Sequence, residues 1–340
     1  MNNSTGYWGN CSEEHLFDTS DFRYTLFPVI YSFLFIVGLP INIAALVFLV
    51  RNKATKRLTE VKIYMISLTV ADLMFIAFLP FWIDYYNRGG DWKFHSFMCS
   101  LCGSLFYINT YNTVFFLALI SFTRYLAVYR PVKAARSRRI LRGFISTAVI
   151  WLATICFSLP TLINSQRHVV RADDGMLRCF ESYKQPSTKT ELLVMHLLIL
   201  LGFLASFGVV IANSALILRR LSVDQQLLRI SQGRLQKRAF RMVLLVLTIY
   251  LFCFLPHHLV QLPWLLLVLN FWKSTDCAFR RIVNDVHQVT LCLMCINCVL
   301  DPILYCFLTV NFREYVKGLT QSCRSKCTLS SSPKPQVIQL

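Results

Sequence analysis

The chain has 340 residues, of which 55% are hydrophobic and only 15% are charged, where soluble domains usually carry about 25% charged residues. So few charged groups cannot cover a water-facing surface, and the composition therefore favours a protein embedded in lipid. The formal net charge of +18 could indicate nucleic-acid binding, but Lys and Arg gather in short segments beside apolar runs, so we expect no nucleic-acid partner.

Seven apolar segments follow one another along the chain, and each is long enough to cross the hydrocarbon core as a helix, which takes about 20 residues. They run near Tyr24–Val50, Val61–Tyr85, Phe97–Val128, Ile140–Ile163, Leu192–Leu218, Ala239–Leu269 and Ile282–Leu308. The sequence therefore predicts an all-α membrane protein with a seven-transmembrane helix bundle over residues 24–308.

The charge of the connecting segments alternates from one to the next. Basic clusters around Arg57, Arg138 and Lys237 follow the first, third and fifth spans, whereas the alternate segments carry acids such as Asp21 and Asp91. Basic loops stay on the cytoplasmic side of a membrane. We therefore expect a multi-pass protein of the plasma membrane whose N-terminal segment, residues 1–23, is extracellular and whose residues 309–340 are cytoplasmic.

The cytoplasmic end begins with Asn311–Leu319, which reads as a short amphipathic helix lying on the inner leaflet. The tail that follows is rich in Ser, Thr and Pro, and its cysteines are candidates for palmitoylation: Cys323 and Cys327.

The expected outer side carries two kinds of covalent site. Glycan acceptor sequences begin at Asn2, Asn3 and Asn10. The cysteines on this oxidising side are Cys11, Cys99, Cys179 and Cys277. Four cysteines allow three pairings, and the sequence alone does not choose among them.

Two acids lie inside the predicted spans, Asp72 in the second and Asp301 in the seventh. A central Asp costs about 2.5–3.5 kcal/mol on insertion scales, so we expect each to be stabilised by a sodium ion, a proton or water. Pro256 and Pro302 also lie within spans, where each removes a backbone donor and frees the carbonyl four residues earlier.

The pattern over the whole chain resembles the rhodopsin-like family of G-protein-coupled receptors. The residues that carry the resemblance are Asn42, Leu68, Asp72, Cys99, Arg124, Trp151, Cys253-Phe-Leu-Pro256 and Asp301-Pro-Ile-Leu-Tyr305. The resemblance implies that Arg124 faces the cytoplasm and contacts the G protein when the sixth helix moves outward. It also implies a receptor and not an enzyme, with heterotrimeric G proteins of the Gq and Gi classes, arrestin and receptor kinases as partners.

Several positions depart from the family pattern. Thr123 stands where an acid usually precedes the arginine, Phe254 replaces a common Trp, and Asn213 or Ser214 stands near the usual Tyr of the fifth helix. These changes alter the expected contacts of the resting state but leave the expected fold unchanged.

The resemblance also assigns roles to residues whose partners the sequence leaves open. It implies a Cys99–Cys179 disulfide, and a second pairing of Cys11 with Cys277. It also implies a sodium ion as an allosteric modulator, with no other cofactor, bound by Asp72, Thr113, Asn297 and Asp301.

The ligand pocket is predicted from residue chemistry. Phe106 occupies the third-helix site where amine receptors place an Asp, so a monoamine is disfavoured, and aromatic rings must meet any cationic ligand group. The rings are Trp82, Tyr86, Phe106, Tyr107 and Tyr111. Polar donors that suit one phosphate or ester come from His196, His257, His258, Gln261, His287 and Gln288, with Glu181 at the outer edge.

Longer stretches, such as Arg178-Cys-Phe-Glu181 and Pro256–Trp264, resemble the receptors for phosphocholine ether lipids within this family. We therefore expect a lipid ligand of that type and a calcium response, with a receptor of the nucleotide or lysophospholipid group as the alternative. A zinc site is disfavoured because no His pair has i, i+4 spacing and no Asp, Glu or Cys completes a ligand set. An intramembrane aspartyl protease and a transporter are disfavoured as well, since the Gly-x-Gly-Asp context and inverted halves are absent.

Overall fold

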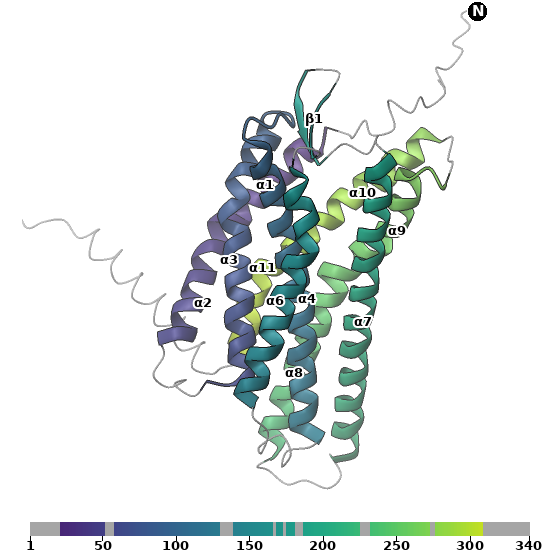
Figure 1. Ribbon diagram of the computed structural model, residues 1–340. Helices are drawn as coiled ribbons and strands as arrows, with labels where there is room; N and C mark the ends of the chain where they lie inside the picture. Colours follow the sequence, from purple (N-terminus) through teal and green to yellow (C-terminus); the bar gives the residue numbers. More distant parts are fainter. Residues whose placement is uncertain are drawn as a thin grey trace, which may run out of the picture.

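The structure, a computed structural model, describes residues 21–51, 58–129, 139–165, 168–172, 175–180, 186–224, 232–272 and 276–308. Within these ranges seven helices are long and apolar enough to cross a membrane, and they form one elongated bundle (Figure 1). The predicted seven-helix bundle is therefore confirmed. The expected amphipathic helix Asn311–Leu319 lies outside the described residues.

The spans are built from single helices or from helical pieces in series. The first contains α1 (Arg23–Phe33), the π-helical turn η2 (Leu34–Gly38) and α2 (Leu39–Arg51). The next four are α3 (Glu60–Asn87), α4 (Ser96–Tyr129), α6 (Arg139–Ile163) and α7 (Pro186–Asp224). The sixth contains α8 (Gln232–Ile249), η5 (Tyr250–Phe254) and α9 (Leu255–Val268), and the seventh contains α10 (Cys277–Cys295) and α11 (Asn297–Leu308).

The fifth and seventh helices begin earlier than their hydropathy predicts. α7 starts at Pro186 and α10 at Cys277, whereas the apolar runs begin at Leu192 and Ile282. Hydropathy detects only the part of a helix that lies in hydrocarbon, and the helix continues into the polar interface. For α10 the side chain of Asp276 caps the helix by accepting from the N–H groups of Ala278 and Phe279.

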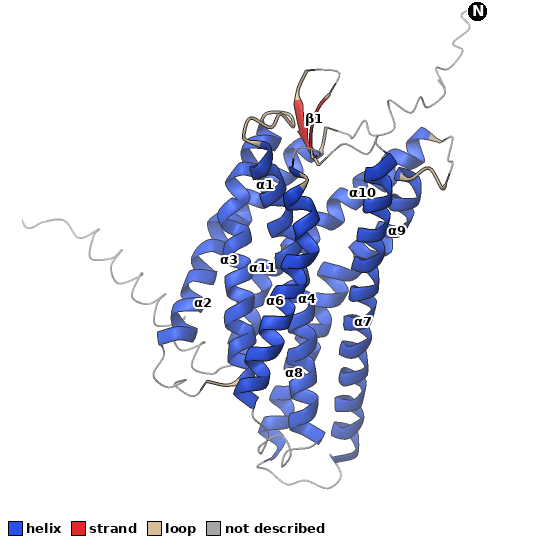
Figure 2. Cartoon of the chain, viewed as in Figure 1, coloured by secondary structure: helices blue, strands red, loops and turns tan. Residues whose placement is uncertain are grey.

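A short hairpin lies at one end of the bundle, drawn in red in Figure 2. Strands β1 (Val169–Arg171) and β2 (Leu177–Cys179) pair antiparallel, with Val169 opposite Cys179. The hairpin belongs to the segment between α6 and α7. It marks the end of the bundle that carries the expected extracellular loops.

The third span is the central helix of the bundle. In its most apolar 18-residue window, 72% of the residues are buried inside the protein, against 11% in the fourth span. Buried side chains of α4, among them Phe116, pack with Phe203 of α7 and with Tyr250 and Phe254 of the sixth span. The fourth span is peripheral, so most of its surface faces lipid.

Two prolines change the hydrogen-bond pattern inside the spans. Pro256 follows the π-helical turn η5, where the missing donor loosens the regular hydrogen-bond pattern. Pro302 frees the carbonyl of Cys298, and the Asn42 side-chain amide donates to that oxygen (2.8 Å) as well as to the Gly38 carbonyl (3.0 Å). Asn42 therefore supplies the donor that Pro302 removes, because lipid offers none.

Gly103 in α4 provides a test of the packing at the hairpin end. A Cβ at this position would lie 2.3 Å from the ring of Phe180, which is itself stacked on His168. We predict that Gly103→Ala destabilises the protein by about 1–3 kcal/mol, because the ring must move. The measurement is the thermal unfolding midpoint of the purified protein. Gly208→Ala is the control, since nothing lies within 4 Å of its added carbon, and an equal effect of both changes would contradict the prediction.

Candidate functional site

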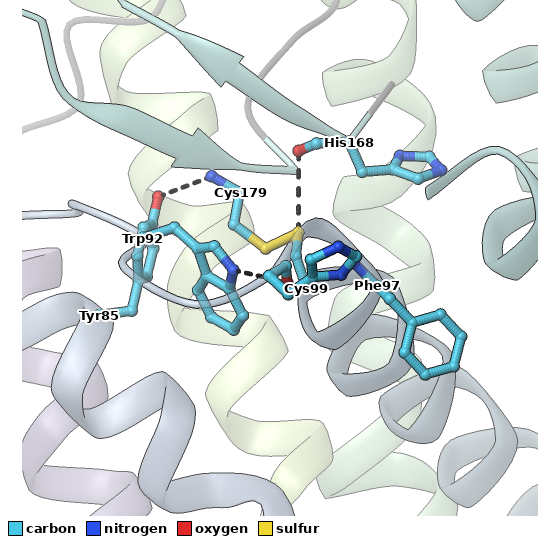
Figure 3. The surroundings of a disulfide bond; sticks show 7 residues. Tyr85, Trp92, Phe97, Cys99, His168 and Cys179 are labelled. Atoms are coloured by element: carbon cyan, nitrogen blue, oxygen red, sulfur yellow. Dashed lines mark hydrogen bonds between the residues drawn. A yellow bond between two sulfur atoms is a disulfide. The ribbon is translucent and has the colours of Figure 1, made fainter. Parts of the chain in front are cut away.

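The outer end of the bundle is tied together by a disulfide between Cys99 of α4 and Cys179 of β2 (Figure 3). This is the pairing that the family resemblance implies. The Tyr85 hydroxyl accepts from the N–H of Cys179 (3.4 Å), and the fully buried Trp92 packs in the same cluster. The hairpin is therefore fixed over the outer ends of α3 and α4.

Arg178 makes a second attachment of the hairpin to the helices. Its Nη1 donates to the carbonyl oxygens of Gly89 (2.6 Å) and Gly90 (3.1 Å) and to the Tyr24 hydroxyl (3.0 Å). Nearby, Asp91 accepts from the N–H of Leu177 (3.1 Å). A hydrogen bond from Lys93 and the one from Leu177 lower the pKa of Asp91, so its carboxylate stays charged at neutral pH.

The predicted aromatic residues lie in two connected groups. Trp82 and Tyr86 of α3 stack with ring centroids 6.0 Å apart, and Tyr86 also stacks on Phe27 of α1 at 4.5 Å. In α4, Tyr107 and Tyr111 stack at 6.4 Å. Phe106 links the two groups. It contacts Tyr107 of the second group, and it contacts Phe75 of α3, which belongs to the cluster against which Trp82 and Tyr86 pack.

Tyr111 differs from the other predicted rings, because it is buried and packs against Phe157 of α6. Its contacts therefore resemble helix packing between α4 and α6. Trp82, Tyr86, Phe106 and Tyr107 are only partly buried, so they retain ring surface that a ligand can contact.

The predicted histidines come together between the sixth, fifth and seventh spans. His257 lies 5.0 Å from His287 and 5.5 Å from His258, measured between ring centroids. His287 stacks on Trp264 at 4.1 Å, and Trp264 also contacts His196 of α7 at 5.6 Å. The four histidines are buried, and Gln288 is half-buried beside them.

Some polar atoms of this group are paired within the protein. His257 Nδ1 lies 3.3 Å from the Thr290 hydroxyl, and His196 Nδ1 lies 2.8 Å from the Leu192 carbonyl. His258 Nδ1 lies 2.8 Å from the Phe254 carbonyl, and Gln261 donates to the His196 carbonyl at 3.5 Å.

Other polar atoms of the same group are buried but have no hydrogen-bond partner among the described residues. They are His258 Nε2, Gln261 Oε1 and His287 Nδ1. An unsatisfied buried polar atom costs about 1–3 kcal/mol. Their concentration at one place is therefore typical of a site that binds a polar group from outside the chain.

Three of the residues that are predicted to bind sodium, Asp72, Thr113 and Asp301, lie near one another. Asp72 and Asp301 are fully buried, and Asp301 lies near Asp72 and Thr113. Oxygens without a partner among the described residues are Asp72 Oδ2, Thr113 Oγ1, Asp301 Oδ1 and Asp301 Oδ2. Oxygen atoms of carboxylates and hydroxyls are the ligands that hard cations prefer, so the residues present fit a sodium ion.

Sequence reasoning missed two members of this polar cluster. The Asn109 amide donates to Asp72 Oδ1 (2.7 Å), and the Cys298 thiol donates to the side-chain oxygens of Asn109 (3.5 Å) and Asn297 (3.2 Å). Asn109 lies one helical turn before Thr113 on α4, and that spacing is the signal that could have found it.

The opposite end of the bundle contains the expected G-protein contact. Arg124 is half-buried in the last turns of α4, and the neighbouring Thr123 hydroxyl donates to the Ile120 carbonyl of its own helix (2.8 Å). Thr123 therefore has a local packing role. Glu60 of α3 accepts from Arg142 of α6 at Nε (2.7 Å) and Nη2 (2.6 Å), an ion pair that the sequence did not predict.

Some predicted sites lie outside the described residues: Asn2, Asn3, Asn10, Cys11, Glu181, Cys323 and Cys327. The side chain of Cys277 is likewise not described, so the Cys11–Cys277 pairing stays a prediction. In the described part of the chain no three His, Cys, Asp or Glu side chains gather as a metal-binding group.

The sequence of this chain is similar to those of known receptors over most of its length. The profile of the 7 transmembrane receptor (rhodopsin family) matches residues 41–305. The platelet-activating factor receptor of Cavia porcellus is 41% identical over 91% of this chain and 90% of its own length, and that of Homo sapiens is 40% identical over 92% and 91%. The G-protein coupled receptor 68 of Mus musculus is 32% identical over 91% of this chain and 80% of its own length.

One contact between α4 and the sixth span can be tested directly. The buried Tyr250 hydroxyl in η5 donates to the Val114 carbonyl. We predict that Tyr250→Phe lowers stability by about 1 kcal/mol, a typical net value for a hydrogen bond, as measured by the thermal unfolding midpoint. Tyr107→Phe is the matched control, because no hydrogen bond of its hydroxyl is found among the described residues. A loss of stability that is equal in the two variants would contradict the role of the bond.

Proposed function

This chain belongs to the rhodopsin family of seven-transmembrane receptors, and on that basis we propose that it binds a phosphocholine ether lipid of the platelet-activating factor type and activates heterotrimeric G proteins. Its family makes it a multi-pass plasma-membrane receptor and not an enzyme. The ligand, the G-protein classes and the calcium response are our proposals.

The group at His258, Gln261 and His287 carries the proposal for the phosphate end of the ligand. Each of these residues has a buried polar atom without a partner in the described part of the chain. The His287 imidazole and the Gln261 amide NH₂ group can donate to a phosphate oxygen, whereas His258, whose Nδ1 faces the Phe254 carbonyl, donates through Nε2 when its ring is protonated. A hydrogen bond to a charged group contributes about 1.5–3 kcal/mol. A single phosphate therefore suits the N–H groups that these three side chains can present.

The aromatic residues support the proposal that the choline group of the ligand binds between α3 and α4. A quaternary ammonium group next to an aromatic face gains about 0.5–2 kcal/mol. Trp82, Tyr86 and Phe106 keep ring surface on the side of α3 and α4. The alkyl tail would occupy apolar surface of the bundle, and each buried CH₂ group contributes about 0.8 kcal/mol.

A nucleotide is less well suited to this site. Several phosphates would require fixed cations, and α9 (Leu255–Val268) carries His and Gln but no Lys or Arg. The relatives at about 40% identity are named for platelet-activating factor, which supports the same choice.

For signal transmission we propose the route that the family implies. The ligand biases the sixth span near η5 and Pro256, and the opposite end of that span moves away from Arg124, which then contacts a G protein. Activation would mobilise calcium through the Gq class, with the Gi class, arrestin and receptor kinases as further partners. The expected orientation places the N-terminus outside the cell.

We further propose that a sodium ion stabilises the resting state at Asp72, Thr113, Asn297 and Asp301. A cation compensates the burial of two carboxylates in a region that excludes bulk water. A ligand that favours a state without this cavity would expel the ion.

The ligand site is tested with shape-conserving changes. We predict that His258→Phe and Gln261→Leu each weaken binding of the phosphocholine ether lipid about tenfold to a hundredfold, the loss expected for one hydrogen bond to a charged group. His258→Phe keeps the ring stacked on Phe203, 3.8 Å away in the parent. Lipid binding and surface expression are measured separately.

The control for these changes is Ser158→Ala, which removes a buried hydroxyl that bonds only within α6 among the described residues. Normal expression with undiminished lipid affinity in both variants would place the ligand elsewhere. A response to nucleotides alone would contradict the lipid assignment.

The sodium site is tested through its salt dependence. We predict that agonist affinity of the parent receptor falls as sodium replaces a larger organic cation at constant ionic strength, and that Asp72→Asn abolishes this dependence. The measurement is agonist competition binding in membranes. Glu60→Gln, at the first residue of α3 and about three turns from Asp72, should keep the sodium effect. The site would be refuted by an unchanged sodium effect in Asp72→Asn.

Most members of the family have an acid immediately before the arginine, and this chain has Thr123 there. The effect of this difference is tested by introducing an acid at position 123. We predict that Thr123→Asp lowers basal nucleotide exchange on the G protein up to about fivefold, because a partly wet ion pair with Arg124 contributes about 1 kcal/mol or less. Ligand binding should survive. Thr123→Ser retains the hydroxyl that bonds to Ile120 and serves as the control, and unchanged or higher basal exchange in Thr123→Asp would count against the prediction.

A further inference from the structure

His258 of α9 has one ring nitrogen that is bonded within its own helix and one that is not. Its Nδ1 lies 2.8 Å from the Phe254 carbonyl oxygen. A carbonyl oxygen only accepts, so Nδ1 carries a hydrogen. In a neutral imidazole the second nitrogen, Nε2, then has a lone pair and no hydrogen. Nε2 is buried and has no hydrogen-bond partner among the described residues, so the neutral ring offers a ligand an acceptor at this point.

The packing of His258 fixes which of its nitrogens is available. The residue is 3% exposed, and its ring stacks on Phe203 of α7 with centroids 3.8 Å apart and an angle of 11° between the planes. Rotation of the ring by half a turn would place a C–H group at the Phe254 carbonyl and break the hydrogen bond there. That loss is unfavourable inside a membrane-spanning bundle. Nδ1 therefore stays at the carbonyl, and Nε2 is the nitrogen that a ligand can contact.

The lipid proposed above has no donor for a lone pair at Nε2. The oxygens of a phosphodiester, an ether and an acetyl ester accept hydrogen bonds, and a quaternary ammonium group carries no N–H. A phosphate oxygen opposite an unprotonated Nε2 would place two acceptors against each other. A proton on Nε2 changes the same contact into a charge-assisted hydrogen bond, which is about twice as strong as a neutral one.

The surroundings of His258 favour the neutral ring in the empty site. The titratable side chains around it come from its own helix, from α7, from α10 and from η5: His257, His196, His287 and Tyr250. Among the described residues, the groups that act electrostatically on the four histidines are the histidines themselves. A buried charge without a counter-charge is unfavourable. A bound phosphate supplies the counter-charge that the described residues around His258 do not.

We propose, on the basis of the lipid ligand proposed above, that the phosphate binds together with one proton, which His258 takes up at Nε2. The ring is neutral in the empty receptor and protonated in the complex, so a fall in pH favours the complex. The phosphodiester and the quaternary ammonium of the lipid do not titrate near neutral pH, so the proton is bound by the protein. By linkage, uptake of one proton raises the affinity by up to about tenfold for each unit by which the pH falls.

The test is equilibrium binding of radiolabelled platelet-activating factor to the full chain in phosphatidylcholine nanodiscs, from about pH 8 to about pH 6, the range in which histidine titrates. We expect the affinity of the parent to rise about tenfold to a hundredfold over this range. Calorimetric titration in buffers with different heats of ionisation measures the number of protons taken up on binding. We expect about one proton at the upper end of the range.

Three variants test whether His258 binds this proton. His258→Phe keeps the stacking on Phe203 but cannot take up a proton, so its affinity should be low and independent of pH. Its difference from the parent should be largest at low pH, whereas a purely structural defect would lower the affinity by the same factor at every pH. Gln261→Leu should weaken binding but keep the pH dependence. His95→Asn changes an exposed histidine between α3 and α4, and it should keep both the affinity and the pH dependence.

Saturable binding whose affinity does not change with pH would overturn this inference alone, because a water molecule that donates to both Nε2 and the phosphate would then satisfy the ring. A pH dependence that His258→Phe retains would likewise overturn this inference and leave the proposed function in place. An absence of saturable lipid binding at every pH would overturn the proposed function, and this inference with it.

Discussion

Lipid offers no hydrogen-bond partner, so every polar group inside the spans must be satisfied by the bundle itself. The pairing of Asn42 with the carbonyl that Pro302 frees illustrates how the constraint shapes the fold, because one side chain joins the first span to the seventh. Tyr250 plays a similar part when its hydroxyl joins the sixth span to Val114 of α4. The helices are thus held in register by a small number of polar contacts in an apolar core.

Because lipid offers no partner, the buried polar atoms that remain unsatisfied among the described residues indicate where an ion or a ligand can bind. Near mid-membrane they are oxygens of Asp72, Thr113 and Asp301, which suit a cation. Between the fifth, sixth and seventh spans they belong to two imidazoles and an amide, side chains whose N–H groups can donate to a phosphate. The two groups of unsatisfied atoms differ in their chemistry and in their position in the bundle. The sixth span also contributes to the bundle core, through Tyr250, Phe254 and their apolar neighbours. Such an arrangement allows ligand binding and cation binding to be coupled through the movement of one span.

Much of the fold could be predicted from the sequence, because the hydropathy of the chain indicates each of the seven spans. The family resemblance added the Cys99–Cys179 pair. Contacts that depend on helix rotation and on the third dimension could not be obtained in this way. Among these are the bond from Asn109 to Asp72, the ion pair of Glu60 with Arg142, and the packing of Tyr111 against Phe157. In the ligand site, residue types indicated the histidine group. Only the structure distinguishes His257, which is near Thr290, from His258, one of whose nitrogens has no partner among the described residues.

We propose above all that the histidine group of this receptor binds the phosphate of a phosphocholine ether lipid. The most direct test is equilibrium binding of a radiolabelled phosphocholine ether lipid to the purified chain in nanodiscs, with parent protein and the Gln261→Leu variant compared side by side. We expect saturable binding to the parent that unlabelled lipid displaces and nucleoside diphosphates do not, with clearly weaker binding to the variant. Saturable binding of a nucleoside diphosphate, together with no saturable binding of the lipid, would contradict it.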